Sequence, residues 1–63
     1  MFTNSEILKS ILESKGLTIH KVYLQMNKNR DVYRAFENNH FTEKFIERLE
    51  KIVGENLHYF INS

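Results

Sequence analysis

Apolar residues recur along this chain at the three- and four-residue spacing of helix faces, and no stretch alternates as a half-buried β-strand would. Five such apolar faces follow one another, and each of them is short. They occupy residues 7–12, 19–26, 32–36, 45–53 and 57–61. The pattern therefore predicts an all-α fold of five short helices.

Polar residues that cap helices stand at the ends of these faces. Thr3 and Glu6 have the spacing of a capping box. Phe2 and Ile7 flank them as a hydrophobic staple. Gly16 supplies the left-handed conformation in which many helices end. The other predicted capping, turn or terminating residues are Thr18, Asn27, Asn29, Asn38, Asn39, Thr42, Gly54 and Asn56.

Residues from about 18 to 39 have the pattern of a helix, a tight turn and a second helix. Asn27 suits the turn, because asparagine tolerates left-handed backbone better than most residues. In the second helix Phe36 faces inward, while Val32 and Tyr33 compete for the other inward position, a choice that the sequence leaves open. A helix braced in this way, with long polar side chains in its first turn, fits a DNA major groove.

The length of 63 residues allows a single domain, residues 1–63, whose small core must be well arranged. The absence of cysteine excludes a disulfide framework, a thiolate metal site and a cysteine nucleophile. No apolar run approaches the ~20 residues that span a bilayer, and the first residues lack the features of a secretory signal. We therefore expect a cytoplasmic protein without a membrane partner.

The net charge of +1 conceals an uneven distribution of charge along the chain. Residues 15–34 carry five Lys or Arg side chains against one Asp, a net +4, whereas residues 1–14 carry −1 and residues 35–63 carry −2. Basic charge thus gathers on the helix-turn-helix segment, as a DNA-binding surface requires. The alternative is a solvated helix surface on which charges cluster by chance.

Four segments together resemble the phage lambda repressor/Cro-type helix-turn-helix family. They are Gly16-Leu17-Thr18, Met26-Asn27, residues 29–38 and residues 49–60. The resemblance implies a compact five-helix bundle of lambda repressor-like type, acting as a repressor-like transcriptional regulator of phage or bacterial type. Three residues depart from the family pattern. Ile19 replaces a glutamine that often contacts phosphate, Tyr23 replaces a small residue, and Lys28 replaces an apolar residue of the turn.

The candidate DNA-reading residues lie at the start of the third predicted helix. Arg30 and Arg34 are one turn apart, and an arginine fork matches either a guanine edge or a phosphate. Asn29 is first a helix cap and second a hydrogen-bonding group for DNA. Asp31 complements the helix dipole, and it could orient Arg34 or accept from cytosine. Tyr33 either belongs to the core or reaches a phosphate.

Further residues around this unit are candidates for contacts to DNA phosphates, which set affinity and its salt dependence without reading sequence. Thr18 would place the free amides of a helix N-terminus at a phosphate. The polar residues after the third helix could touch the DNA backbone or form a plain polar loop. The candidates are Lys15, Thr18, Lys21, Lys28, Asn38 and Asn39, with His40 beside them.

Helix-turn-helix domains often act as two-fold dimers, and we expect a homodimer contact to come from the last predicted helix. The alternative role of that helix is only to seal the core. Leu24 lies off the apolar face of its helix, so we expect it to be exposed. The candidates for the dimer contact are Leu57, Tyr59, Phe60 and Ile61.

The sequence leaves two other classes of function beside binding of double-stranded DNA. The first is a protein-binding module with little DNA affinity, such as an antirepressor, an antitoxin or an inhibitor of a nucleic-acid enzyme. The weak net charge, Asp31 and Tyr23 favour it. The second is catalysis, which is not expected because His20, His40 and His58 lack metal-ligand spacing and no phosphate-loop motif is present. We expect neither a cofactor nor a metal.

Overall fold

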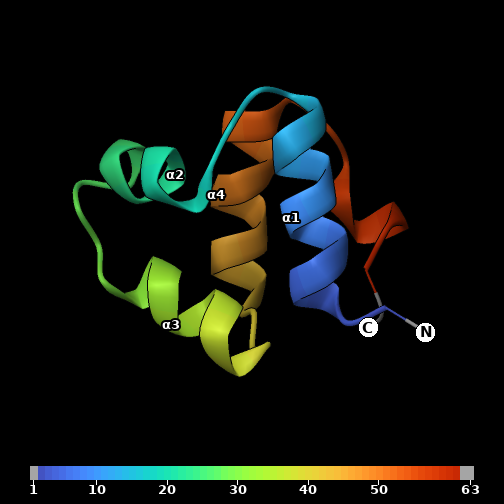
Figure 1. Cartoon of the computed structure of the whole chain (residues 1–63), viewed down its shortest axis with the longest axis horizontal. Helices are drawn as coiled ribbons and strands as arrows, with labels where there is room; N and C mark the ends of the chain where they lie inside the picture. The colour runs from blue at the N-terminus through green and yellow to red at the C-terminus, as the bar shows by residue number, and fades with distance from the viewer. Residues whose placement is uncertain (1, 62–63) are drawn as a thin grey trace.

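The structure is a computed structural model that describes residues 2–61, and it is helical throughout (Figure 1). Four α-helices are followed by one short 3₁₀-helix, and no strand occurs within residues 2–61. The elements are α1 (Asn4–Ser14), α2 (Ile19–Gln25), α3 (Asp31–Asn38), α4 (Glu43–Val53) and η1 (Leu57–Tyr59). The predicted all-α class is confirmed.

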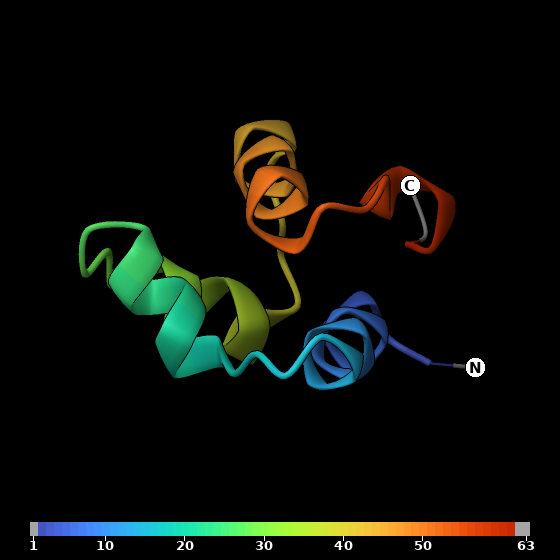
Figure 2. The same ribbon diagram turned by 90° about the horizontal axis from the view of Figure 1, so that it is seen from above.

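α4 lies between the α2–α3 pair and the C-terminal segment that contains η1 (Figures 1 and 2). Side chains from every element meet in one core. Its members are each less than a tenth exposed: Leu8, Leu12, Val22, Met26, Val32, Phe36, Ile46, Leu49, Val53 and Leu57. Because one side of α4 faces α3 and another faces η1, the charges on these two sides have different surroundings.

The predicted caps explain where the helices begin and end. The Thr3 side chain accepts from the Glu6 amide and the Glu6 carboxylate accepts from the Thr3 amide, which completes the capping box of α1. Thr18 and Thr42 cap α2 and α4 in the same way with their hydroxyl oxygens. Gly16 follows α1 with a φ of +71°, a conformation that glycine adopts without strain.

The N-cap of α3 differs by one position from the predicted cap at Asn29. Asn27 and Lys28 both have a φ of +58°, so two successive left-handed residues reverse the chain. The formal N-cap position of α3 then falls on Arg30, whose side chain makes no capping hydrogen bond. Asn29 caps from one residue earlier, because its side-chain oxygen accepts from the Asp31 amide at 2.9 Å.

α3 settles the choice that the sequence left open between Val32 and Tyr33. Val32 is fully buried, whereas 42% of Tyr33 is exposed. The C-terminal end of α3 is tied to α1, because the Ser5 hydroxyl donates to the Phe36 carbonyl at 2.6 Å and the Asn39 side chain accepts from the Ser5 amide at 2.8 Å. α3 is thus anchored at one end and presents Tyr33 outward.

The fifth α-helix predicted after Asn56 is wrong. Asn56 does cap this segment, since its side chain accepts from the His58 amide, but the single 3₁₀ turn η1 replaces the helix. A short 3₁₀ turn presents fewer residues to one side than an α-helix does. Leu57 is accordingly buried and Ile61 packs against the core, while half of Phe60 is exposed.

Candidate nucleic-acid interface

Arg30 and Arg34, the residues predicted to read DNA, are exposed at the start of α3. The ion pairs within residues 2–61 all lie elsewhere, so neither guanidinium group is held by a carboxylate of that part of the chain. Asp31 does not form the predicted pair with Arg34. Both arginine side chains are therefore open to an external partner.

α4 carries a second group of cations that the sequence analysis did not single out. Lys44, Arg48 and Lys51 follow one another at i, i+4 and i+7 and so share one side of the helix. Lys44 and Arg48 border a groove shared with α3, and Arg48 and Lys51 border a hollow shared with residues 25–27. We call these three residues the basic stripe. The negative sum over residues 35–63 concealed it, whereas its helical spacing would have revealed it.

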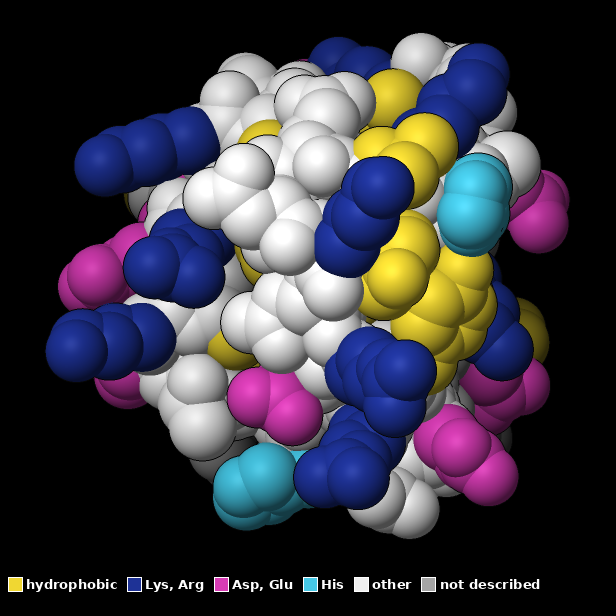
Figure 3. All heavy atoms as spheres, turned by 90° about the vertical axis from the view of Figure 1, so that its left-hand side faces the viewer, with side chains coloured by type: hydrophobic (Ala, Val, Ile, Leu, Met, Phe, Trp, Pro, Cys, Tyr) yellow, Lys and Arg dark blue, Asp and Glu magenta, His cyan; other side chains and the backbone are white. Residues whose placement is uncertain are grey.

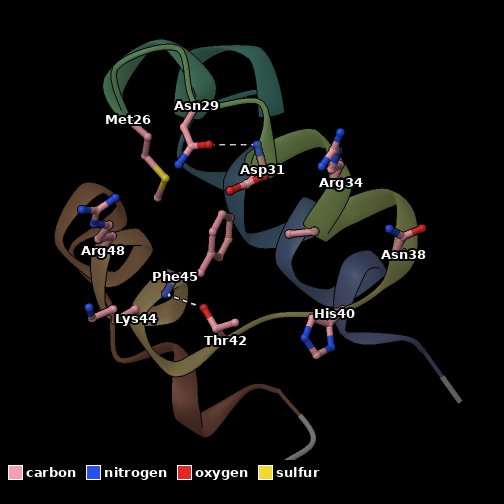
Figure 4. A pocket seen from close by; sticks show the side chains of 11 residues that line it. Met26, Asn29, Asp31, Arg34, Asn38, His40, Thr42, Lys44, Phe45 and Arg48 are labelled. Atoms are coloured by element: carbon pink, nitrogen blue, oxygen red, sulfur yellow. Dashed lines mark hydrogen bonds between the residues drawn. The ribbon is translucent and has the colours of Figure 1, made fainter.

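The groove between α3 and α4 has a volume of about 360 Å³ and combines apolar and basic side chains (Figure 4). The Phe45 ring and the Met26 side chain point into its middle. Arg34 lies on the α3 side, while Lys44 and Arg48 lie on the α4 side. The apolar lining, which we call the floor, consists of Met26, Ala35 and Phe45.

A bridge of aromatic side chains holds α2 against α3. His20 Nδ1 and the Tyr33 hydroxyl lie 2.8 Å apart, within hydrogen-bonding distance. The centroid of the Tyr23 ring is 5.6 Å from that of His20 and 5.1 Å from that of Tyr33. Tyr23, a departure from the family pattern, thus supports Tyr33 from α2. The Tyr33 hydroxyl is engaged with His20, while the rest of this side chain remains partly exposed.

Several predicted phosphate contacts are engaged within the protein. Lys15 Nζ forms an ion pair with a glutamate of the C-terminal segment at 2.8 Å, and Lys21 Nζ donates to a main-chain carbonyl at 3.2 Å. The side-chain oxygens of Thr18 and Asn39 accept from main-chain amides. Of the predicted contacts, the side chains that are exposed near α3 and not engaged in this way within residues 2–61 are Lys28, Asn38 and His40.

The four predicted dimer residues divide into buried and exposed ones. Leu57 is fully buried in the core, so its side chain is not available to a second copy in this structure. Ile61 is half-buried and packs against the core. Tyr59 and Phe60 are 84% and 50% exposed, and they are the two candidates available to a second copy. Leu24 is 46% exposed, as expected.

On the side of α4 that faces η1, His58 bridges two carboxylates. Its Nδ1 lies 2.9 Å from Glu50 and its Nε2 lies 3.1 Å from Glu43, while Glu50 also accepts from the Leu57 amide. The hydrogen bond to Glu50, and then that to Glu43, raises the pKa of His58. The same contact with His58 lowers the pKa of Glu50. This cluster fastens η1 to α4. It was not predicted from the sequence, because its members are far apart in the chain.

Basic side chains gather on the face formed by α2, α3 and the adjoining side of α4, around an apolar area (Figure 3). No ion pair within residues 2–61 involves the three cations of residues 28–34 or the three of the basic stripe. We call this group the basic face. It consists of Lys28, Arg30, Arg34, Lys44, Arg48 and Lys51.

Comparison of the chain with protein-family models, curated proteins and solved structures finds no match. The resemblance to the lambda repressor/Cro type therefore remains a prediction from the sequence. Among the helices of residues 2–61, none is long and apolar enough to cross a bilayer. The same residues contain no group of three or more His, Asp or Glu side chains placed to hold a metal ion.

Proposed function

We propose that this protein binds double-stranded DNA and regulates transcription, with the outward side of α3 entering the major groove. The observation that carries the proposal is the basic face, whose cations have no carboxylate partner within residues 2–61. Clustered, available Lys and Arg side chains are the electrostatic requirement for binding a polyanion. The resemblance of residues 16–60 to repressor-type domains supports the same proposal.

Each part of the basic face has its own role in this proposal. Arg30 and Arg34 contact base edges or phosphates from α3, because guanidinium groups can donate two hydrogen bonds to a guanine edge. The basic stripe of α4 contacts phosphates of the DNA strand that borders the major groove. The Tyr33 ring, positioned by His20, adds an apolar surface of the kind that contacts a thymine methyl group.

The simplest regulatory action is that of a repressor in the cytoplasm, which occupies an operator and blocks polymerase. A single domain of this size covers little DNA, so two copies on an inverted repeat would bind more tightly. Tyr59 and Phe60 are the exposed apolar residues proposed to join the two copies.

The first experiment is selection of bound fragments from random DNA at moderate salt. We expect enrichment of a common sequence, and enriched inverted repeats would establish two-fold symmetry. The affinity for the enriched duplex should fall linearly with salt on a log–log plot, because bound phosphates release counterions. Failure to retain any duplex at low salt would refute DNA binding.

The second experiment separates base reading from phosphate contact at Arg34. Arg34→Ala should weaken binding to the enriched duplex by about 1–3 kcal/mol more than binding to a scrambled duplex if this side chain reads a base. Fluorescence anisotropy measures both affinities. Equal weakening on the two duplexes would assign Arg34 to a phosphate instead.

A further inference from the structure

The floor of the α3–α4 groove is a feature that binding of a DNA backbone does not use. Met26 and Phe45 point into the groove (Figure 4). Ala35 on α3 also lines it and completes the apolar surface. A phosphate strand brings charge to this site but no apolar side chain to cover the floor. A ligand that carries both would remove apolar surface from water as well as pair with the cations, and so would bind more tightly.

The rim of the groove has the charge that such a ligand must complement. Arg34 on α3 lies across the floor from Lys44 and Arg48 on α4 (Figure 4). None of these cations forms an ion pair within residues 2–61, although the chain has eight Asp and Glu residues. Asp31 is the one carboxylate in the lining. Carboxylates are well suited to such a rim, because an arginine fork pairs with a carboxylate through two hydrogen bonds.

We propose that this groove binds an acidic segment of a partner protein, which inserts one apolar side chain between α3 and α4. Carboxylates on either side of that anchor pair with Arg34, Lys44 and Arg48, while the anchor covers the floor. Because Arg34 also belongs to the DNA-facing side of α3, the acidic segment and DNA exclude each other. Only this exclusion rests on the proposed function, and the binding of the segment does not.

The probe is a short synthetic peptide, capped at both ends, in which one leucine lies between two Asp-Glu pairs. Its twin has serine in place of leucine. We expect the leucine peptide to bind the protein about tenfold more tightly in fluorescence anisotropy, since burial of most of a leucine side chain supplies that factor. Equal affinity of the two peptides, or no binding of either at low salt, would overturn the proposal.

Two variants separate the floor from the rim. Ala35→Leu fills the floor and keeps every charge, so the leucine peptide should lose its advantage over the serine twin. Arg48→Glu reverses a rim charge, so both peptides should bind about tenfold more weakly. Lys9→Glu makes the same change of net charge on α1 and should leave both affinities unchanged.

Thermal unfolding followed by circular dichroism establishes that each variant is folded. A leucine advantage that persists in folded Ala35→Leu would show that the floor is not the binding site. If Ala35→Leu does not fold, the comparison of the two peptides on the natural sequence and on Arg48→Glu still decides the proposal.

Competition with a labelled random-sequence duplex tests the exclusion. The leucine peptide should displace the duplex at about a tenth of the concentration that the serine twin needs. Simultaneous binding of duplex and peptide would overturn the exclusion. Absence of duplex binding at low salt would overturn the proposed function and the exclusion that rests on it, whereas the peptide affinities, measured without DNA, would still decide the groove.

Discussion

The two sides of α4 carry opposite charges and have opposite surroundings. Toward η1, Glu43 and Glu50 are bridged by His58 at 3.1 and 2.9 Å. Toward α3, the basic stripe has no carboxylate partner within residues 2–61. The acidic side is therefore part of what holds the fold together, whereas the basic side is available to an anion from outside.

The basic stripe works against the stability of α4 in isolation. Like charges at i and i+4, such as Lys44 and Arg48, destabilise a helix by about 0.2–0.5 kcal/mol. Three of the chain's glutamates, Glu43, Glu50 and Glu55, pair with His58 and Lys15 on other surfaces, and no carboxylate within residues 2–61 forms an ion pair with the basic stripe. A group of cations kept together at such a cost is what the binding of a polyanion or an acidic segment requires.

The largest effect should follow from Leu49→Ala. This change removes a buried side chain that anchors α4 in the core and so positions both of its charged sides. Leu49 is fully buried, and deletion of a buried leucine side chain costs about 2–5 kcal/mol. A domain of 63 residues has a total stability of only about 3–9 kcal/mol. Urea denaturation followed by circular dichroism should show a variant that is largely unfolded or close to it.

Glu47→Ala is the matched control for this prediction, because Glu47 is exposed on the same helix. Its free energy of unfolding should stay within about 0.5 kcal/mol of the starting value. If Leu49→Ala had an effect as small as that of the control, α4 would not be the common support of the two sides.

The local features of the fold could be predicted from the sequence, while the contacts between distant segments could not. The side chains of Thr3, Thr18 and Thr42 accept hydrogen bonds from amides three residues ahead. Each cap can therefore be recognised from four consecutive residues of the sequence. The contact of His58 with Glu43 spans fifteen positions and exists only because η1 turns back on α4.

The basic face could be predicted from the sequence only in part. The spacing of Lys44, Arg48 and Lys51 is local and could have been recognised, but summing charge along the chain averaged it with the glutamates of the same helix. Which side of α4 meets α3 is a tertiary fact, and so is the groove. The inward position of Val32 in place of Tyr33 was likewise decided by packing, because both residues satisfied the helical period.

A smaller effect is expected from neutralising the basic stripe with Lys44→Gln, Arg48→Gln and Lys51→Gln together. If each residue contacts a phosphate, DNA affinity at low salt should fall about 100-fold, and the slope of the log–log salt plot should fall by about 3. Anisotropy titrations of one duplex at several salt concentrations measure both quantities. The unfolding free energy should change by less than about 1 kcal/mol, because relief of the repulsion between Lys44 and Arg48 offsets the loss of Lys51 from the last turn of α4.

The matched control removes the same number of charges from α1, α2 and the segment between them, with Lys9→Gln, Lys15→Gln and Lys21→Gln. Lys15 and Lys21 are engaged within the protein, so this triple variant should lose less than about tenfold in affinity. Equal losses in the two triple variants would mean that DNA responds to net charge alone and that the side of α4 facing α3 has no special part.

The smallest effect should come from the acidic side, because ion pairs between exposed groups contribute little to stability. The pKa of His58 is raised in the folded state, so its contribution is fully present below its ordinary value of 6.5 and is lost as pH rises through the raised pKa. The pKa of Glu50 is lowered, so its contribution is present above 4.5 and is lost as pH falls through the lowered pKa. The free energy of unfolding contributed by this pair should therefore be highest between pH 4.5 and 6.5.

His58→Gln should remove the decline in stability expected of the natural sequence as the pH rises through the raised pKa of His58, and urea denaturation across the pH range measures it. His40→Gln is the control, because His40 lies in the loop before α4 and has no hydrogen bond to a carboxylate within residues 2–61. Identical pH profiles for the two variants would show that His58 does not fasten η1 to α4. The acidic side would then be as open as the basic stripe, and the lack of a partner there would no longer indicate a binding surface.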